Sequence, residues 1–159
     1  MIELLELLEK DHTLPLDQLA VMLNKPQSEI EKAIKRLENE KIIVKYHTII
    51  NWDKAGVDSV TAIIAVKITP QREVGFDSVA ERIYRFPEVR SLYLMSGAYD
   101  LLAMIEGSSL KEVANFVSTK LSTIDGVVST TTHFMLKKYK EAHVIMDDRE
   151  ADHRLVVSP

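Results

Sequence analysis

The sequence predicts an α+β protein made of two parts that differ in the order of their elements. The first fifty residues carry apolar side chains at the three- and four-residue spacing of amphipathic helices. From residue 59 onward, β-branched runs and two helical patterns follow one another in the order β-α-β-β-α-β. Between the parts lies "NWDKAGVD" (51–58), whose Asn, Asp and Gly residues predict a linker. We therefore expect domains at 1–50 and 59–142 and a tail at 143–159.

The first two helices are short and end at recognisable residues. The segment "MIELLELLEK" (1–10) has leucine and isoleucine at helical spacing, and "HT" interrupts the pattern. Pro15 fits the first turn of a second helix, where its missing N–H costs no hydrogen bond. That helix runs to about Leu23. Asn24 suits a left-handed position after it, and Pro26 can begin the next helix.

The third helix continues the same spacing and leads into a β-rich segment. Ser28 and Glu31 have the spacing of a capping box, which would move the start of the helix inward by two residues. The following "IIVKYHTII" (42–50) is β-branched and aromatic, so a strand or short ribbon is expected. Three helices, a tight turn between the second and third, and a ribbon are typical of a winged helix-turn-helix domain. The apolar face of the third helix consists of Ile30, Ala33, Ile34 and Leu37.

The second part has the element order of a ferredoxin-like domain. We expect strands at 60–68, 89–95, 100–106 and 127–138, and helices at 74–86 and 110–121. This β-α-β-β-α-β order forms an antiparallel sheet with both helices on one face. The tail from residue 143 has no clear pattern.

Composition excludes several classes of function. The chain has no cysteine, and therefore no disulfide, thiolate zinc site or cysteine nucleophile. Its five histidines lack metal-ligand spacing, and no glycine-rich phosphate loop or nucleophile elbow is present, so we expect no metal site, no catalytic residues and no enzyme. No apolar run reaches 18 residues and the N-terminus is too acidic for a signal peptide, which favours a cytoplasmic protein without a membrane span.

The polar face of the third helix suggests contact with DNA. On a helical wheel, Ser28, Lys32 and Lys35 lie opposite the apolar face, with Glu29 and Glu31 on the two flanks. The glutamates lie near the helix start, where the helix dipole stabilises negative charge. The helix considered by itself is more typical of a solvated charged face. The preceding helix and tight turn favour double-stranded DNA as the partner, through Gln27, Ser28, Lys32, Lys35 and Arg36.

The turn "SGAYD" (96–100) is the second candidate site. Gly97 permits a positive φ, and Asp100 can accept hydrogen bonds from turn amides, which would be a purely structural role. Alternatively, the exposed backbone N–H groups bind the carboxylate of an effector while Asp100 pairs with its ammonium group. The sequence alone leaves both readings open.

Taken together, the two parts resemble the leucine-responsive regulatory protein (Lrp/AsnC) family of transcription regulators. The resemblance lies in "LPLDQLAVML" and "IEKAIKRLENEKII" in the first part, and in "MSGAYDLLAMIEG" and "DGVVSTTTHFMLKKYK" in the second. It covers roughly residues 2 to 142. Family members often have a polar residue near Ala98, so the chemistry of effector binding can differ here.

The resemblance implies a DNA-binding regulator whose second domain binds a small effector, usually an amino acid. It also implies a homo-oligomer, in which dimers assemble further, up to an octamer. No cofactor is implied. The alternative is an amino-acid sensing or assembly module, in which the helix-turn-helix contributes dimer contacts and has little intrinsic DNA binding. The effector site implied by the resemblance comprises Ser96, Gly97, Ala98, Tyr99, Asp100, Thr130 and Thr132.

Overall fold

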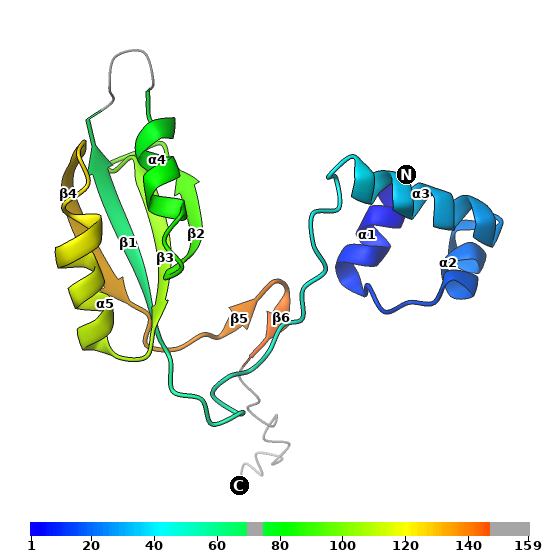
Figure 1. The fold of residues 1–159 in the computed structure, drawn as a ribbon. Coiled ribbons are helices and arrows are strands. Elements are labelled where there is room, and N and C mark those ends of the chain that lie inside the picture. Colours follow the sequence, from blue (N-terminus) through cyan, green and yellow to red (C-terminus); the bar gives the residue numbers. More distant parts are fainter. Residues whose placement is uncertain (70–74, 147–159) are drawn as a thin grey trace, which may run out of the picture. The chain divides into compact units, whose positions relative to one another are not determined.

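The computed structural model describes residues 1–69 and 75–146 and divides the chain into two compact units (Figure 1). The first unit is Met1–Ile49 and the second begins at Ile50. Each unit has its own cluster of buried apolar side chains. No helix in the described part of the chain is long and apolar enough to cross a membrane.

The first unit consists of three helices, as predicted. They are α1 (Ile2–Lys10), α2 (Leu16–Leu23) and α3 (Gln27–Asn39). Asn24 ends α2 in the left-handed conformation, with φ 50° and ψ 48°, which confirms the role expected for it. The buried core comprises Leu4, Leu8, Leu19, Ile30 and Leu37.

The predicted capping box of α3 is wrong. The helix begins at Gln27 after Pro26, whose φ of −60° already suits a helix start, and no side chain caps it. Ser28 is therefore inside the helix. Glu31 pairs with Lys35 one turn later, at 2.6 Å between Oε1 and Nζ, instead of reaching back toward the helix start.

The predicted ribbon at 42–50 is not a strand in this chain. A ladder requires a second strand, and none among the described residues pairs with this segment. Most of its apolar side chains stay exposed, with Val44 at 79%, whereas Ile43 packs against the core of the helices. Tyr46 anchors the segment to the helices, because its hydroxyl donates to Glu38 at 3.0 Å and its ring stacks on His12 at 5.5 Å between centroids.

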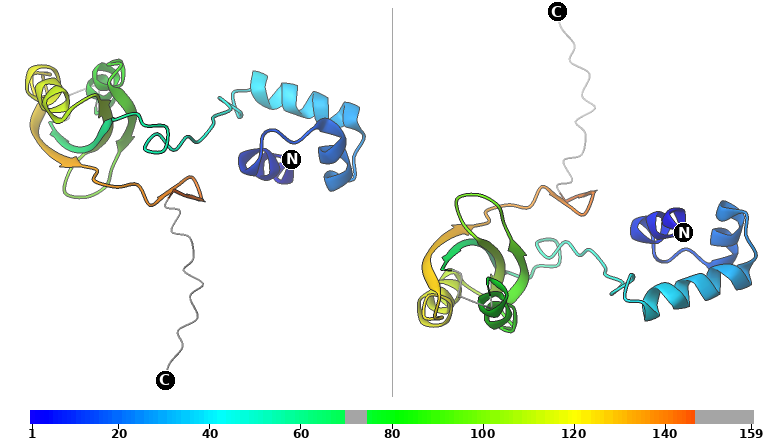
Figure 2. Two further views of the ribbon diagram at one scale, coloured as in Figure 1. Left: turned by 90° about the horizontal axis from the view of Figure 1, so that it is seen from below. Right: turned by 90° about the horizontal axis from the view of Figure 1, so that it is seen from above.

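The second unit is a ferredoxin-like domain, as predicted from the element order. Its antiparallel sheet has the strand order β2-β3-β1-β4. Both helices lie on the same face of the curved sheet (Figure 2). The strands are β1 (Val60–Ile68), β2 (Val89–Leu94), β3 (Leu101–Gly107) and β4 (Val127–Phe134); the helices are α4 (Asp77–Tyr84), α5 (Leu110–Phe116) and the π-helix η1 (Val117–Leu121).

The register of the sheet decides which side chains face the helices. Ile64 and Val66 are fully buried in the core beneath α4 and α5. Neither side chain can therefore contribute to an association surface on the sheet. Strand alternation instead puts Ile63 and Ala65 on the face away from the helices. We call this surface the open face; its central side chains are Ile63, Ala65, Leu102 and Met104.

A small hairpin follows the sheet. Strands β5 (Lys140–Glu141) and β6 (Val144–Ile145) pair through a turn in which Ala142 and His143 have φ of 40° and 69°. The predicted last strand therefore ends at Phe134 rather than at residue 138, and the hairpin crosses the expected start of the tail. Residues 147–159 of the tail, and residue 74 of the predicted helix 74–86, lie outside the described residues.

The π-helix η1 is attached to the sheet by Lys120. Its ammonium group forms an ion pair with Glu88 and lies 5.7 Å from the ring centroids of both Phe86 and Phe116. The hydrogen bond from Lys120 lowers the pKa of Glu88 below its ordinary value of 4.5, against the opposing effect of partial burial.

Glu88→Gln is expected to reduce stability in a pH-dependent way. The folded-state pKa of Glu88 is depressed, so its contribution is present above the unfolded pKa and is lost as pH falls through the folded pKa. At pH 7 we expect a loss of about 0.5–1 kcal/mol, since both groups are partly solvated. Urea unfolding at pH 7 and below pH 4.5 measures the effect. A difference that stays constant with pH would contradict it.

Candidate functional site

The exposed surface of α3 contains all five residues predicted to contact DNA. Ile30 and Leu37 anchor the other side of the helix in the core, each only 1% exposed. This packing fixes which side of α3 faces solvent. The exposed residues on that side are Gln27, Ser28, Lys32, Lys35 and Arg36.

Ion pairs neutralise part of this basic surface. The side chain of Lys35 donates a hydrogen bond to the carboxylate of Glu31. This hydrogen bond lowers the pKa of Glu31 and raises the pKa of Lys35. On the other flank, Glu29 pairs with Lys25, which precedes the helix. Within the described ranges, Lys32 is the one α3 lysine without an ion-pair partner. Sequence reasoning missed Lys25, although its four-residue spacing from Glu29 was a usable signal.

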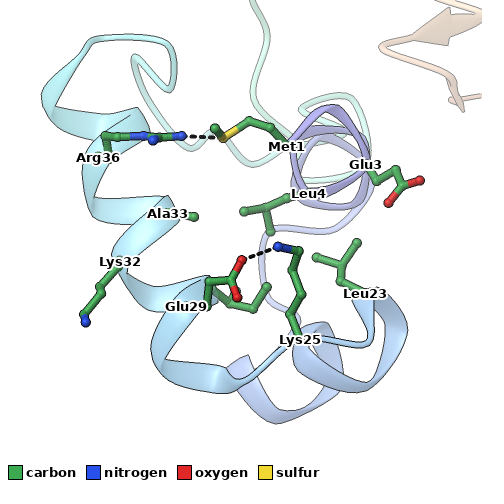
Figure 3. Close-up of a pocket in the computed structure, with 10 residues that line it drawn as sticks. Met1, Glu3, Leu4, Leu23, Lys25, Glu29, Lys32, Ala33 and Arg36 are labelled. Atoms are coloured by element: carbon green, nitrogen blue, oxygen red, sulfur yellow. Dashed lines mark hydrogen bonds and ion pairs between the residues drawn. The ribbon is translucent and has the colours of Figure 1, made fainter.

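A pocket of about 430 Å³ lies between α1 and α3 (Figure 3). The side chain of Arg36 reaches across one end and donates a hydrogen bond to the sulfur of Met1, at 3.0 Å. The Lys25–Glu29 ion pair closes the other end, and Ala33 faces the space between them. The remaining lining residues are Glu3, Leu4, Leu23, Ile30 and Lys32.

The "SGAYD" turn joins β2 to β3 and is tied to β1 through Asp100. Its carboxylate Oδ2 accepts a hydrogen bond from the backbone N–H of Ile68 at 2.8 Å. The backbone N–H of Asp100 donates to the carbonyl of Val66 at 3.1 Å. Gly97 has φ 149°, and Ser96, Gly97 and Ala98 are exposed, while Tyr99 and Asp100 are half-buried. Asp100 therefore has a structural partner at the end of β1, where the register with β4 shifts.

The two threonines of the predicted effector site lie on β4. Thr130 is directly opposite Val66, and Thr132 is opposite Ile64, so both share the helix-covered face and are half-buried. Thr130 Oγ1 is 3.4 Å from Ser122 Oγ. Because β1 lies between β4 and β3, Thr130 is about 10 Å from the strand that follows the turn. The threonines and the turn thus flank β1 from opposite sides.

Residues 1–69 and 75–146 contain no cluster of three or more His, Cys, Asp or Glu side chains that could hold a metal ion.

Comparison with known proteins agrees with this architecture. Residues 61–145 match the model of the Lrp/AsnC ligand binding domain. The chain is 53% identical over 158 residues to the uncharacterized HTH-type transcriptional regulator YugG of Bacillus subtilis, covering 99% of this chain and 95% of that protein. It is 34% identical to the HTH-type transcriptional regulator LrpA of Pyrococcus horikoshii, covering 86% and 94%.

Solved structures of similar fold include two bacterial regulators. A transcriptional regulator of Neisseria meningitidis in complex with L-methionine has a TM-score of 0.71 and 23% identity, covering 88% of this chain and 90% of the other. The AsnC protein of E. coli has a TM-score of 0.69 and 19% identity, covering 91% and 94%. At these identities the likeness shows the fold. With the family model and the close relatives, it establishes that the chain belongs to the Lrp/AsnC family of transcription regulators.

Proposed function

We propose that the chain binds double-stranded DNA through the exposed side of α3 and responds to an amino acid held beside the turn at 96–100. The observation that carries the DNA half is the placement of Lys32, Lys35 and Arg36 on one exposed side of a helix whose other side is fixed in the core. A helix held in this way can enter the major groove and direct its cations toward phosphates.

The effector half rests on the exposed backbone at the turn and on the charge of Asp100. The amides near Gly97 can approach a carboxylate closely because glycine has no side chain. Asp100 uses Oδ2 for Ile68, whereas Oδ1 makes no hydrogen bond within the described residues. That oxygen can accept from an ammonium group. The regulator crystallised with L-methionine supports an amino acid as the effector class.

DNA reading by this fold also requires a homo-oligomer. One α3 helix with partly neutralised cations binds DNA weakly, and two helices one duplex turn apart add their contacts. The open face of the sheet and the segment 42–50 are the surfaces proposed for association. The open face carries the half-buried apolar side chains of Ile63, Leu102 and Met104, and the segment leaves apolar side chains and unpaired backbone exposed.

A second candidate function is a sensing or assembly module with little DNA affinity. The ion pairs of Lys25 and Lys35 with glutamates favour it. A salt titration of binding to the DNA upstream of the gene separates the two functions. A DNA reader loses affinity steeply as salt rises, with a slope set by the number of phosphates it neutralises. An absence of binding at low salt would establish the sensing module.

Two substitutions of Asp100 test the effector site. Asp100→Asn keeps an oxygen that can accept from the Ile68 N–H but removes the charge, so we expect about ten- to hundred-fold weaker amino-acid binding with little loss of stability. Asp100→Ala also removes the acceptor, and we expect it to destabilise the protein by about 1–3 kcal/mol. A thermal-shift screen with the twenty amino acids identifies the ligand, and calorimetric titration measures its affinity.

The two variants distinguish a ligand contact from a turn contact. If Asp100→Asn binds the amino acid as tightly as the unchanged protein, Asp100 serves only the turn. If no amino acid raises the unfolding temperature even at millimolar concentration, the proposed effector class is wrong.

A further inference from the structure

The pocket between α1 and α3 is a cavity outside the proposed effector site, and it shares only Arg36 and Lys32 with the proposed DNA surface. Its volume of about 430 Å³ lies within the range of small-molecule sites, roughly 300–1,000 Å³. Its middle is apolar, formed by Leu4, Leu23, Ile30 and Ala33. Its two ends are polar, with Arg36 at one and the Lys25–Glu29 ion pair at the other (Figure 3). A ligand that fits must therefore have an apolar body and a polar group at one end.

The hydrogen-bond partners of Arg36 indicate which polar group the ligand carries. Its guanidinium donates to a thioether sulfur, which is a weak acceptor, and the nearest carboxylate oxygen, from Glu40, is 3.8 Å away. Among the described residues no closer oxygen accepts from it. A carboxylate would give Arg36 charge-assisted, bidentate hydrogen bonds in place of the contact with Met1.

The charges at the other end select against a cationic ligand. Glu29 is already neutralised by Lys25, and Glu3 points away from the space between the helices (Figure 3). Lys32 also lines the pocket, but its side chain points away from the space between the helices (Figure 3), so Arg36 is the charge that a ligand can pair with inside the pocket. Free inorganic phosphate fits poorly, because it would leave the apolar middle of the pocket uncovered.

We propose that this pocket is a second ligand site, in the helical unit, that binds a monocarboxylate with an apolar body. The carboxylate pairs with Arg36 and displaces the Met1 sulfur, while the body lies against Leu23 and Ala33, which are half-buried, above the buried Leu4 and Ile30. Arg36 also belongs to the surface proposed for DNA, so an occupied pocket competes with DNA for this side chain. That coupling rests on the proposed function, whereas the binding itself does not.

Methyl-detected NMR titration of the full chain with octanoate tests the site. We expect saturable shifts of the methyl groups of Leu4, Leu23 and Ile30. Acetate has the carboxylate without the apolar body, and octan-1-ol has the body without the carboxylate, so both are expected to bind at least about tenfold more weakly. Absence of saturable shifts at these methyl groups, or equal affinity for octanol, would overturn the proposal.

Two variants and a matched control locate the interaction. Arg36→Gln should weaken octanoate binding about tenfold or more, and Ala33→Leu should block it by filling the pocket. Lys35→Gln removes a charge from the same helix but outside the pocket, so its octanoate affinity should equal that of the unchanged protein. Circular dichroism checks that each variant is folded. Unchanged affinity in a folded Arg36→Gln variant would refute the assignment of the carboxylate.

A competition assay with DNA separates this proposal from the proposed function. We expect saturating octanoate to reduce DNA affinity in the unchanged protein but not in Ala33→Leu. Octanoate that binds at Leu4, Leu23 and Ile30 without changing DNA affinity would leave the site in place and remove Arg36 from the DNA surface.

Discussion

Replacing Lys32 and Lys35 together by alanine is expected to reduce DNA affinity by about a hundredfold or more. Both side chains are exposed on the side of α3 opposite its buried residues, so their removal leaves the core intact. Each substitution removes a charge-assisted contact with a phosphate that contributes about 1.5–3 kcal/mol to binding. Each should also flatten the logarithmic salt slope by about one unit per subunit. Fluorescence anisotropy at several salt concentrations measures both quantities.

A control with the same change in net charge is needed for this experiment. Lys10 lies at the end of α1 and Lys111 in the first turn of α5, and both are exposed. The Lys10→Ala/Lys111→Ala double variant should bind DNA nearly as the unchanged protein does. Equal loss in both double variants would mean that overall charge, rather than α3, controls binding. Full affinity in the α3 variant would favour the sensing module.

Met104→Glu is expected to dissociate the homo-oligomer proposed above. Met104 lies directly opposite Ile63 in the register and occupies the centre of the open face. A carboxylate buried there in an interface between two copies costs several kcal/mol, and a two-fold interface contains the change twice. We expect association to weaken by about a thousandfold or more. Light scattering at micromolar concentration should then give the mass of a monomer.

A matched substitution distinguishes the open face from surface charge in general. Leu110 is 57% exposed at the start of α5, outside the open face, and a negative charge is favoured at a helix start. Leu110→Glu should leave the mass unchanged. An unchanged protein that is monomeric at this concentration would refute the oligomer, and an oligomeric Met104→Glu variant would move the interface to another surface.

Local patterns in the sequence predicted most of the fold. The helices of the first unit follow from apolar residues at helical spacing, and the end of α2 follows from Asn24. Strand β1 has the predicted bounds because β-branched residues fill it and turn-forming residues flank it. In these elements the signal lies within a few neighbouring residues, so no tertiary information was needed.

Features that depend on distant partners could not be predicted in this way. The sequence did not indicate which of Ile63 and Ile64 faces away from the helices, because that choice depends on where α4 and α5 pack. The β-branched and aromatic residues of segment 42–50 favour an extended backbone, but a strand also requires a partner strand. Turn residues Ala142 and His143 adopt positive φ without the usual Gly or Asn, so their sequence gives no warning of the hairpin.

The candidate sites were predictable as positions but not as contacts. The wheel placed Lys32 and Lys35 on the exposed side of α3, whereas the pairing of Lys35 with Glu31 depends on side-chain conformation. Asp100 was identified from its turn, but its partner Ile68 lies 32 residues earlier on a different strand. Sequence therefore indicates which residues are available, and packing decides what they bind.

The glutamates near the start of α3 have a consequence for how the protein finds its target. Binding to random DNA is almost entirely electrostatic. Lys25 and Lys35 already hold the carboxylates of Glu29 and Glu31, so fewer counterions are released from the DNA when α3 meets it. Under the proposed function, the smaller counterion release shortens the time that the protein spends on random sequence, while contacts with base edges still stabilise binding at the correct site. The acidic residues thus lower the affinity for random DNA and raise the ratio of specific to non-specific affinity. That ratio decides how well a site is found among millions of competing sites.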